Sequence, residues 1–110
     1  MSVRYVIRPR ADEDLEEQAY YYAMRGSPET GHRFLVAAHE TFLLLTTQPA
    51  MGWLARLQDP RLKTLRVFPV NGFKRTIILY RTAPDYIDIL RVVHGSRNLQ
   101  ALLRRAGLGQ

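Results

Sequence analysis

The spacing of apolar residues changes once along this chain, from a helical period to a strand period. Between residues 12 and 47 the apolar side chains recur every three or four positions, which is typical of amphipathic helices. Between residues 62 and 93 they alternate with other side chains or form short β-branched runs, which is typical of strands. A chain of 110 residues has room for one domain, so both halves must share one core.

The first half begins with a short strand and a helix. Residues 3–7 alternate in character before Pro9, which indicates a strand that the proline ends. A helix is predicted over residues 12–24, because acidic residues crowd its first turns and complement the positive end of the helix dipole. Gly26 is a natural stop for that helix.

A second helix follows almost at once. Ser27 is a good N-cap and Pro28 suits the first helical position, while Pro49 ends the helix and opens a loop over residues 49–53. The connection is short, so the two helices fold back as an antiparallel hairpin. The residues expected on their buried stripes are Ala11, Leu15, Ala19, Tyr22, Ala23, Phe34, Leu35, Ala38, Phe42 and Leu45.

The second half predicts three strands and a short helix. The strands cover residues 62–68, 74–81 and 86–93, and short turns between them indicate an antiparallel meander. A basic helix is expected over residues 98–106. The fold class is therefore α+β, with a helical hairpin packed on an antiparallel sheet in the order β-α-α-β-β-β and a short C-terminal helix. We expect a single domain over residues 1–110.

The charge is divided unevenly between the halves. Residues 1–55 hold five basic and seven acidic side chains, whereas residues 56–110 hold eleven basic and three acidic ones. The net charge of +6 therefore resides in the second half, which is suited to attract polyanions or acidic proteins.

Several classes of protein are excluded by composition. The chain has no cysteine, which excludes a disulfide, a thiolate nucleophile and a cysteine-based zinc site. It has neither a signal-peptide pattern at its start nor an apolar run long enough to span a membrane. We therefore expect a cytoplasmic protein with no membrane partner.

The histidines give no metal or cofactor site. His32 and His39 are about 10 Å apart along the second helix, which is too far for one metal ion. No glycine-rich phosphate loop is present, so no cofactor is expected either. His94 starts the run His-Gly-Ser-Arg-Asn at the end of the last strand. A turn followed by a helix cap is favoured there over a catalytic cluster.

Two groups of residues are candidates for binding. Eight basic residues fall within the last 45 positions: Arg66, Lys74, Arg75, Arg81, Arg91, Arg97, Arg104 and Arg105. If the strands gather several of them, they suit either a metal-free ribonuclease or an acidic protein segment, and composition does not separate these alternatives. The consecutive Tyr20, Tyr21 and Tyr22 point in different directions on a helix, so at least one is exposed or contacts a partner.

The order of several segments carries a family resemblance. These segments are Arg8 to Leu15, the loop from Pro49 to Gly52, Leu65 to Val70, Ile77 to Tyr80, and Ile89 to Asn98. Together they are similar, over about residues 3–103, to the ParE/RelE superfamily of toxins from toxin–antitoxin systems, and closest to its ParE branch. The resemblance implies a microbial-ribonuclease-like fold and a ParD-like antitoxin, whose acidic C-terminal segment wraps the toxin in a hetero-oligomer.

Two different activities occur in the superfamily that this chain resembles. RelE-type toxins cleave messenger RNA on the ribosome, whereas ParE-type toxins inhibit DNA gyrase. RelE-type toxins have an arginine where this chain has Ile77 and a tyrosine where it has Leu103. Loss of two such groups removes several kcal/mol of transition-state stabilisation. The resemblance therefore favours a plasmid-stabilising gyrase inhibitor that is not an enzyme.

Two alternatives remain open beside the gyrase inhibitor. One is a metal-independent, ribosome-dependent endoribonuclease using Arg66, Lys74, Arg75 and Arg97. The other is a binding module whose only partner is the antitoxin.

Site residues are assigned on the gyrase interpretation. The surface expected to contact the target comprises Trp53, His94, Arg97, Asn98, Arg104 and Arg105. The residues expected to contact the antitoxin are Tyr20, Tyr21, Arg66, Arg81 and Arg91. Direct binding of nucleic acid is not expected.

Overall fold

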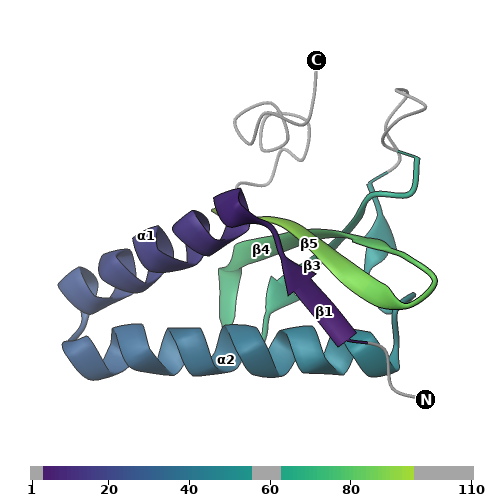
Figure 1. Ribbon diagram of the computed structural model, residues 1–110. Coiled ribbons are helices and arrows are strands. Elements are labelled where there is room, and N and C mark those ends of the chain that lie inside the picture. Colours follow the sequence, from purple (N-terminus) through teal and green to yellow (C-terminus); the bar gives the residue numbers. More distant parts are fainter. Residues whose placement is uncertain (1–3, 56–62, 96–110) are drawn as a thin grey trace.

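The computed structural model describes residues 4–55 and 63–95, in which two helices lie on one face of a five-stranded sheet (Figure 1). The elements are β1 (Arg4–Ile7), α1 (Pro9–Arg25), α2 (Pro28–Thr47), β2 (Trp53–Leu54), β3 (Arg66–Val70), β4 (Phe73–Thr82) and β5 (Tyr86–His94). The predicted α+β class and element order are confirmed, and β2 is a short addition at the end of the loop predicted over residues 49–53. The helix expected over residues 98–106 lies outside the described residues.

The sheet is mixed rather than antiparallel. Its strand order is β1-β5-β4-β3-β2, and β3, β4 and β5 form the predicted antiparallel meander. Strand β1, however, is parallel to β5, with Arg4 beside Tyr86 and Ile7 beside Ile89. The expectation of a wholly antiparallel sheet was wrong at this edge. Parallel pairing needs a long crossover, and the helical hairpin with the strands that follow it supplies one.

Both helices have proline in their first turn. Pro9 is the first residue of α1, earlier than predicted, and Arg8 before it has the extended backbone that proline favours (φ −65°, ψ 152°). Helix α2 begins at Pro28 as predicted, and the backbone N–H of Thr30 donates to the Ser27 hydroxyl at 3.3 Å. These local signals therefore set where each helix starts.

The two helices pack closely as an antiparallel hairpin, as predicted (Figure 1). Helix α1 ends where the Gly26 N–H donates to the carbonyl of Tyr22 at 2.9 Å. A Cβ atom at Gly31 would lie 2.7 Å from the carbonyl oxygen of Ala19, so glycine is required for this approach. The hairpin places α1 against β5, while α2 contacts β1, β3 and β5.

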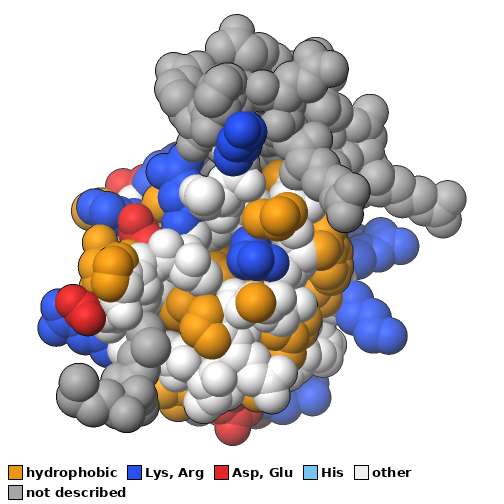
Figure 2. Space-filling view, turned by 90° about the vertical axis from the view of Figure 1, so that its right-hand side faces the viewer, with side chains coloured by type: hydrophobic (Ala, Val, Ile, Leu, Met, Phe, Trp, Pro, Cys, Tyr) orange, Lys and Arg blue, Asp and Glu red, His pale blue; other side chains and the backbone are white. Residues whose placement is uncertain are grey.

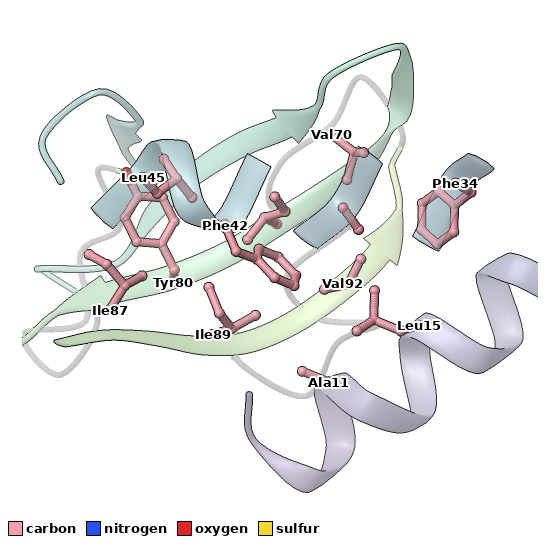
Figure 3. Close-up of a cluster of buried hydrophobic side chains, with 12 residues drawn as sticks. Ala11, Leu15, Phe34, Phe42, Leu45, Val70, Tyr80, Ile87, Ile89 and Val92 are labelled. Atoms are coloured by element: carbon pink, nitrogen blue, oxygen red, sulfur yellow. The ribbon is translucent and has the colours of Figure 1, made fainter. Parts of the chain in front are cut away.

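The main core lies between the helices and the sheet (Figure 3). Its buried members are Ala11, Leu15, Phe34, Ala38, Phe42 and Leu45 from the helices and Val70, Ile78, Tyr80, Ile87, Ile89 and Val92 from the strands. Burial of each large apolar side chain stabilises the fold by about 1.5–3 kcal/mol. All six helical members were predicted from their spacing. The remaining predicted positions, Ala19, Tyr22, Ala23 and Leu35, are only half-buried.

A second, smaller apolar cluster lies on the opposite face of the sheet. Side chains alternate along a strand, so Leu79 points away from Ile78 and Tyr80, which face the helices. The members of the second cluster are Ala55, Leu65, Val67 and Leu79, with Ile77, Leu90 and Val93 packed against them. The sheet is therefore apolar on both faces.

Figure 2 shows the end of the molecule at which β1 begins. Hydrophobic and basic side chains share this surface, and acidic ones are few. The large hydrophobic side chains exposed among residues 4–55 and 63–95 are Val6, Tyr20, Met24, Val36, Leu43, Trp53 and Leu54. Neither α1 nor α2 is long and apolar enough to cross a membrane.

Candidate functional site

A buried tyrosine and an arginine hold the loop between α2 and β2. Tyr80 is fully buried, and its hydroxyl donates to the carbonyl of Pro49 and accepts the N–H of Gly52, each at 2.9 Å. Arg66, opposite Tyr80 in the sheet, donates from Nη1 to the carbonyl of Gly52 at 2.6 Å. A Cβ atom at Gly52 would lie 2.5 Å from the Tyr80 hydroxyl oxygen. We call Pro49, Gly52, Arg66 and Tyr80 the loop clamp.

The environment of the loop clamp keeps the Tyr80 phenol protonated. Burial raises the pKa of Tyr80, and the hydrogen bond from Gly52 together with the charge of Arg66 only partly opposes this. Because a neutral phenol is needed to donate to the carbonyl of Pro49, the raised pKa favours the observed hydrogen bond. The clamp thus gives Arg66 a role inside the fold.

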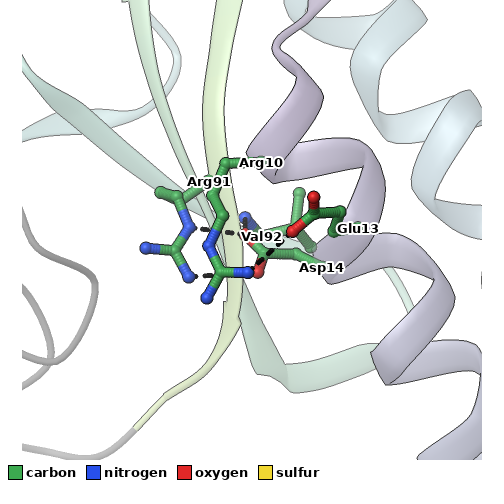
Figure 4. A network of polar contacts seen from close by, with 5 residues as sticks. All are labelled: Arg10, Glu13, Asp14, Arg91 and Val92. Atoms are coloured by element: carbon green, nitrogen blue, oxygen red, sulfur yellow. Dashed lines mark hydrogen bonds and ion pairs between the residues drawn. The ribbon is translucent and has the colours of Figure 1, made fainter.

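Two bidentate ion pairs tie α1 and its start to β5. Arg91 donates to Asp14 from Nε at 2.7 Å and from Nη2 at 3.0 Å, and the side chains are only 11% and 3% exposed (Figure 4). The backbone N–H of Val92 also donates to Asp14, at 3.0 Å. Arg8 binds Asp88 in the same way, at 2.7 and 2.8 Å. Arg91 therefore holds α1 against the sheet.

A pocket of about 310 Å³ opens where the end of α1 meets the β3–β4 turn and the end of β5. It is lined by Tyr21, Tyr22, Arg25, Gly72, Phe73, Lys74, Arg75 and His94. We call it the aromatic–basic pocket. The sequence suggested Tyr21, Lys74, Arg75 and His94 for three separate reasons, and the structure brings the four into one site.

The aromatic rings of this pocket contact one another and the cations beside them. The Tyr21 ring lies 4.9 Å from the His94 ring, and the Arg25 guanidinium carbon is 4.8 Å from the Tyr21 ring centroid. The Tyr22 and Phe73 rings are 4.8 Å apart, edge to face. These contacts give the pocket an apolar floor built from three elements.

The mouth of the aromatic–basic pocket is positively charged. Arg25, Lys74 and Arg75 are all exposed, and none of the eight lining residues is acidic. Like charges around an apolar hollow raise the local concentration of anionic partners. The arrangement can therefore bind a group that is apolar at its tip and negatively charged around it.

Comparison with known proteins decides the family. The family model of the ParE toxin of the type II toxin–antitoxin system parDE matches residues 5–99. The chain belongs to this family. A solved structure of the chromosomal ParDE TA system from P. aeruginosa is similar in fold, with a TM-score of 0.70 and 17% identity, covering 86% of this chain and 98% of that one. No curated protein matches the sequence.

Among the described basic residues suggested for a nuclease in this ParE toxin, Arg66 lies apart from Lys74 and Arg75. Arg66 lies opposite Tyr80, whereas Lys74 and Arg75 stand near the start of β4. Five residues of strand separate Arg75 from Tyr80, which is about 17 Å. Arg97, the fourth residue of that set, lies outside the described residues.

The other residues expected to bind, as far as they fall in the described part of the chain, lie on separate elements. Tyr20 on α1 is 68% exposed and Trp53 on β2 is 54% exposed. Arg81 is half-buried on β4, where it stands opposite Asp88 on β5. Four of the residues expected to contact the target lie outside the described part of the chain: Arg97, Asn98, Arg104 and Arg105. Leu103, which stands where nuclease-type toxins have a tyrosine, also lies outside it.

The two histidines of α2 do not approach each other. His32 is exposed, and the Nδ1 atom of His39 hydrogen-bonds with the Tyr5 hydroxyl at 2.9 Å. Within residues 4–55 and 63–95, no three histidine or acidic side chains lie together in a way that suits a metal ion.

Sequence reasoning missed part of both sites in this toxin. Arg25 follows Tyr21 by four positions on α1, a spacing that puts both on one face and was sufficient to suggest the pair. Phe73 and Gly72 come from the β3–β4 turn, where Gly72 has a φ of +83° that favours glycine. Arg66 binds the backbone carbonyl of Gly52 and Arg91 binds the carboxylate of Asp14. Both partners lie far away along the chain, so no local sequence pattern predicts them.

Proposed function

We propose that this ParE-family toxin acts in the cytoplasm by inhibiting DNA gyrase, and that a ParD-like antitoxin neutralises it in a hetero-oligomer. The family match over residues 5–99 supports a toxin with a cognate antitoxin. The observation that carries the choice of gyrase over messenger RNA is the environment of Ile77.

Ile77 stands where the resemblance implies an arginine in nuclease-type toxins. It packs against the apolar cluster of Leu65, Val67 and Leu79 on the sheet face away from the helices. An arginine there stabilises the charge of a phosphoryl-transfer transition state, whereas an isoleucine supplies no such charge. This environment favours a toxin that binds a protein target over one that cleaves RNA.

A supercoiling assay with purified gyrase tests the proposal. We expect the toxin to inhibit supercoiling at micromolar concentration and to accumulate the covalent gyrase–DNA cleavage complex. The matched control is the same toxin mixed beforehand with the protein encoded by the neighbouring reading frame, which should restore supercoiling. Full gyrase activity at a large excess of toxin contradicts the proposal.

The alternative is a ribosome-dependent endoribonuclease. Lys74 and Arg75 favour it, because they lie in one pocket with His94, and histidine is a common general acid or base. Primer extension on translated messages separates the two functions. New 5′ ends that disappear in the Arg97→Ala variant would establish the nuclease, and their absence together with gyrase inhibition supports the proposal.

A further inference from the structure

We propose that the aromatic–basic pocket binds an acidic segment of the antitoxin, with an apolar side chain of that segment in the pocket and its carboxylates against Arg25, Lys74 and Arg75. This inference rests on the antitoxin named in the proposed function. It assigns that partner to the end of α1 and the start of β4, and it gives the docking segment a definite chemistry.

The floor of the pocket is formed before any partner arrives. The hydroxyls of Tyr22 and Thr76 are hydrogen-bonded at 2.7 Å, and Thr76 donates onward to the Gln18 side chain at 3.3 Å. The Tyr22 ring is held between Phe34, at 5.1 Å, and Phe73, at 4.8 Å. A site whose side chains are already ordered loses little conformational entropy on binding. An apolar side chain of the partner would therefore enter an open hollow whose floor is already ordered.

The distribution of charge along α1 determines which end of the helix attracts an acidic partner. The first half of the helix carries the exposed Asp12, Glu16 and Glu17, together with Glu13, which is ion-paired with Arg10 at 2.8 Å. Its last turn carries Arg25. The helix has 17 residues and is about 25 Å long, so its acidic and basic ends are well separated. An acidic segment is repelled at the first end and attracted at the second, where Lys74 and Arg75 add their charges.

The rings of the pocket are better suited to a side chain than to a nucleobase. Tyr21 is already in contact with Arg25 and with the His94 ring. Tyr22 is in contact with Tyr21 and two phenylalanine rings. Single-stranded nucleic acids are bound by aromatic faces on which successive bases stack. Rings that are engaged inside the protein favour a peptide over a nucleic acid.

An exposed ridge continues the binding surface beyond the pocket. Tyr20 and Met24 are each 68% exposed and lie four residues apart on α1, so they form one apolar strip. Each directly precedes a pocket residue, Tyr21 or Arg25. A partner segment anchored in the pocket therefore has further apolar surface beside it, as amphipathic segments require.

Calorimetric titration of the 110-residue chain tests the inference. The titrant is the purified protein encoded by the reading frame next to the toxin gene. The test variant is Lys74→Glu/Arg75→Glu. The matched control is Arg4→Glu/Arg33→Glu, which makes the same change of net charge at exposed positions on β1 and α2. We expect the pocket variant to bind at least tenfold more weakly, with a reduced salt dependence, and the control to bind within about twofold of wild type. Circular dichroism confirms that both variants are folded.

A second variant tests the apolar part of the site. Tyr21→Ala removes a wall of the pocket and should also weaken binding about tenfold, while its salt dependence stays that of wild type.

The remaining outcomes separate failure of the inference from failure of the proposed function. Equal binding by the pocket variant and the control overturns the pocket assignment but leaves the antitoxin in place. No binding to the wild-type toxin overturns the proposed partner itself. Tight binding of a single-stranded RNA oligonucleotide that is lost in Lys74→Glu/Arg75→Glu overturns the inference in favour of a nucleic-acid site.

Discussion

The loop clamp and the aromatic–basic pocket both pair a tyrosine with an arginine, but the pairs have different surroundings. In the clamp, Tyr80 is fully buried and its hydroxyl bonds two backbone groups, while Arg66 bonds a third. In the pocket, Tyr21 is half-buried and Arg25 lies over its ring at the surface. The same residue types thus stabilise a loop in one region and form an accessible surface in the other.

Strand β4 joins these two regions and shows where the difference arises. Its later part, at Tyr80, is covered by the helices and by the loop after α2. Its first residues, Phe73 and Lys74, follow the turn at Gly72 and border the pocket. Side chains of one strand therefore lie deep in the core at Tyr80 and line an open pocket at Phe73 and Lys74. Substitutions at the two ends should separate stability from binding.

The largest expected effect is on the clamp. Tyr80→Ala removes a fully buried aromatic ring and should lower the free energy of unfolding by about 3–5 kcal/mol. Urea unfolding followed by circular dichroism measures this. Tyr20→Ala is the matched control, because Tyr20 is 68% exposed and its loss should change stability by less than about 0.5 kcal/mol. Similar losses in the two variants would remove the contrast.

A smaller effect is expected at the glycine of the clamp. Gly52→Ala should cost about 1–3 kcal/mol, because the added Cβ atom meets the Tyr80 hydroxyl oxygen at 2.5 Å and the Val67 carbonyl oxygen at 2.8 Å. Tyr80→Phe removes the first of these two atoms. In a double-mutant cycle the combined variant should therefore lose less stability than the sum of the two single variants. Strict additivity would show that the two residues do not interact.

The pH dependence of stability should also distinguish the clamp. Because burial raises the pKa of Tyr80 above its ordinary value of 10.0, the folded state holds this proton more tightly than the unfolded state. The resulting stabilisation is fully present below about pH 10 and is lost as the pH rises through the folded pKa. The free energy of unfolding, measured from neutral to strongly alkaline pH, should fall less steeply with pH for Tyr80→Phe than for wild type. The same pH dependence in both proteins would contradict this role of Tyr80.

The smallest effect on stability is expected at the pocket. Lys74 and Arg75 are exposed, so Lys74→Glu/Arg75→Glu should change the free energy of unfolding by less than about 0.5 kcal/mol. The same protein should bind the antitoxin poorly. A large loss of stability, measured by the same urea unfolding, would show that Lys74 and Arg75 stabilise the fold as the clamp residues do. The two regions would then not differ in the way described.

The features that the sequence predicts well are those with local causes. The hairpin follows from Ser27 and Pro28, which act within one turn, and from the helical spacing that buries Phe34 and Phe42. The meander follows from short turns between strands. Such signals involve neighbouring residues, so they can be recognised in the sequence without knowledge of the fold.

The features that the sequence does not predict arise from contacts between distant segments. The parallel partner of β1 and the carboxylate that binds Arg91 lie many residues away, and nothing in the alternation of strands specifies them. From the sequence, the pocket residues appear only as separate features: a run of tyrosines, a basic pair and the histidine that ends the last predicted strand. They form one pocket because of how α1 packs against the sheet, which local periodicity does not determine.

The parallel pairing of β1 with β5 has a consequence for the timing of synthesis. Arg8, just after β1, binds Asp88, which is 80 residues further along the chain. During translation, at about 5–20 residues per second, β1 has no partner strand until β5 has left the ribosome. A nascent chain therefore passes through most of its synthesis before β1 acquires its partner strand in the sheet.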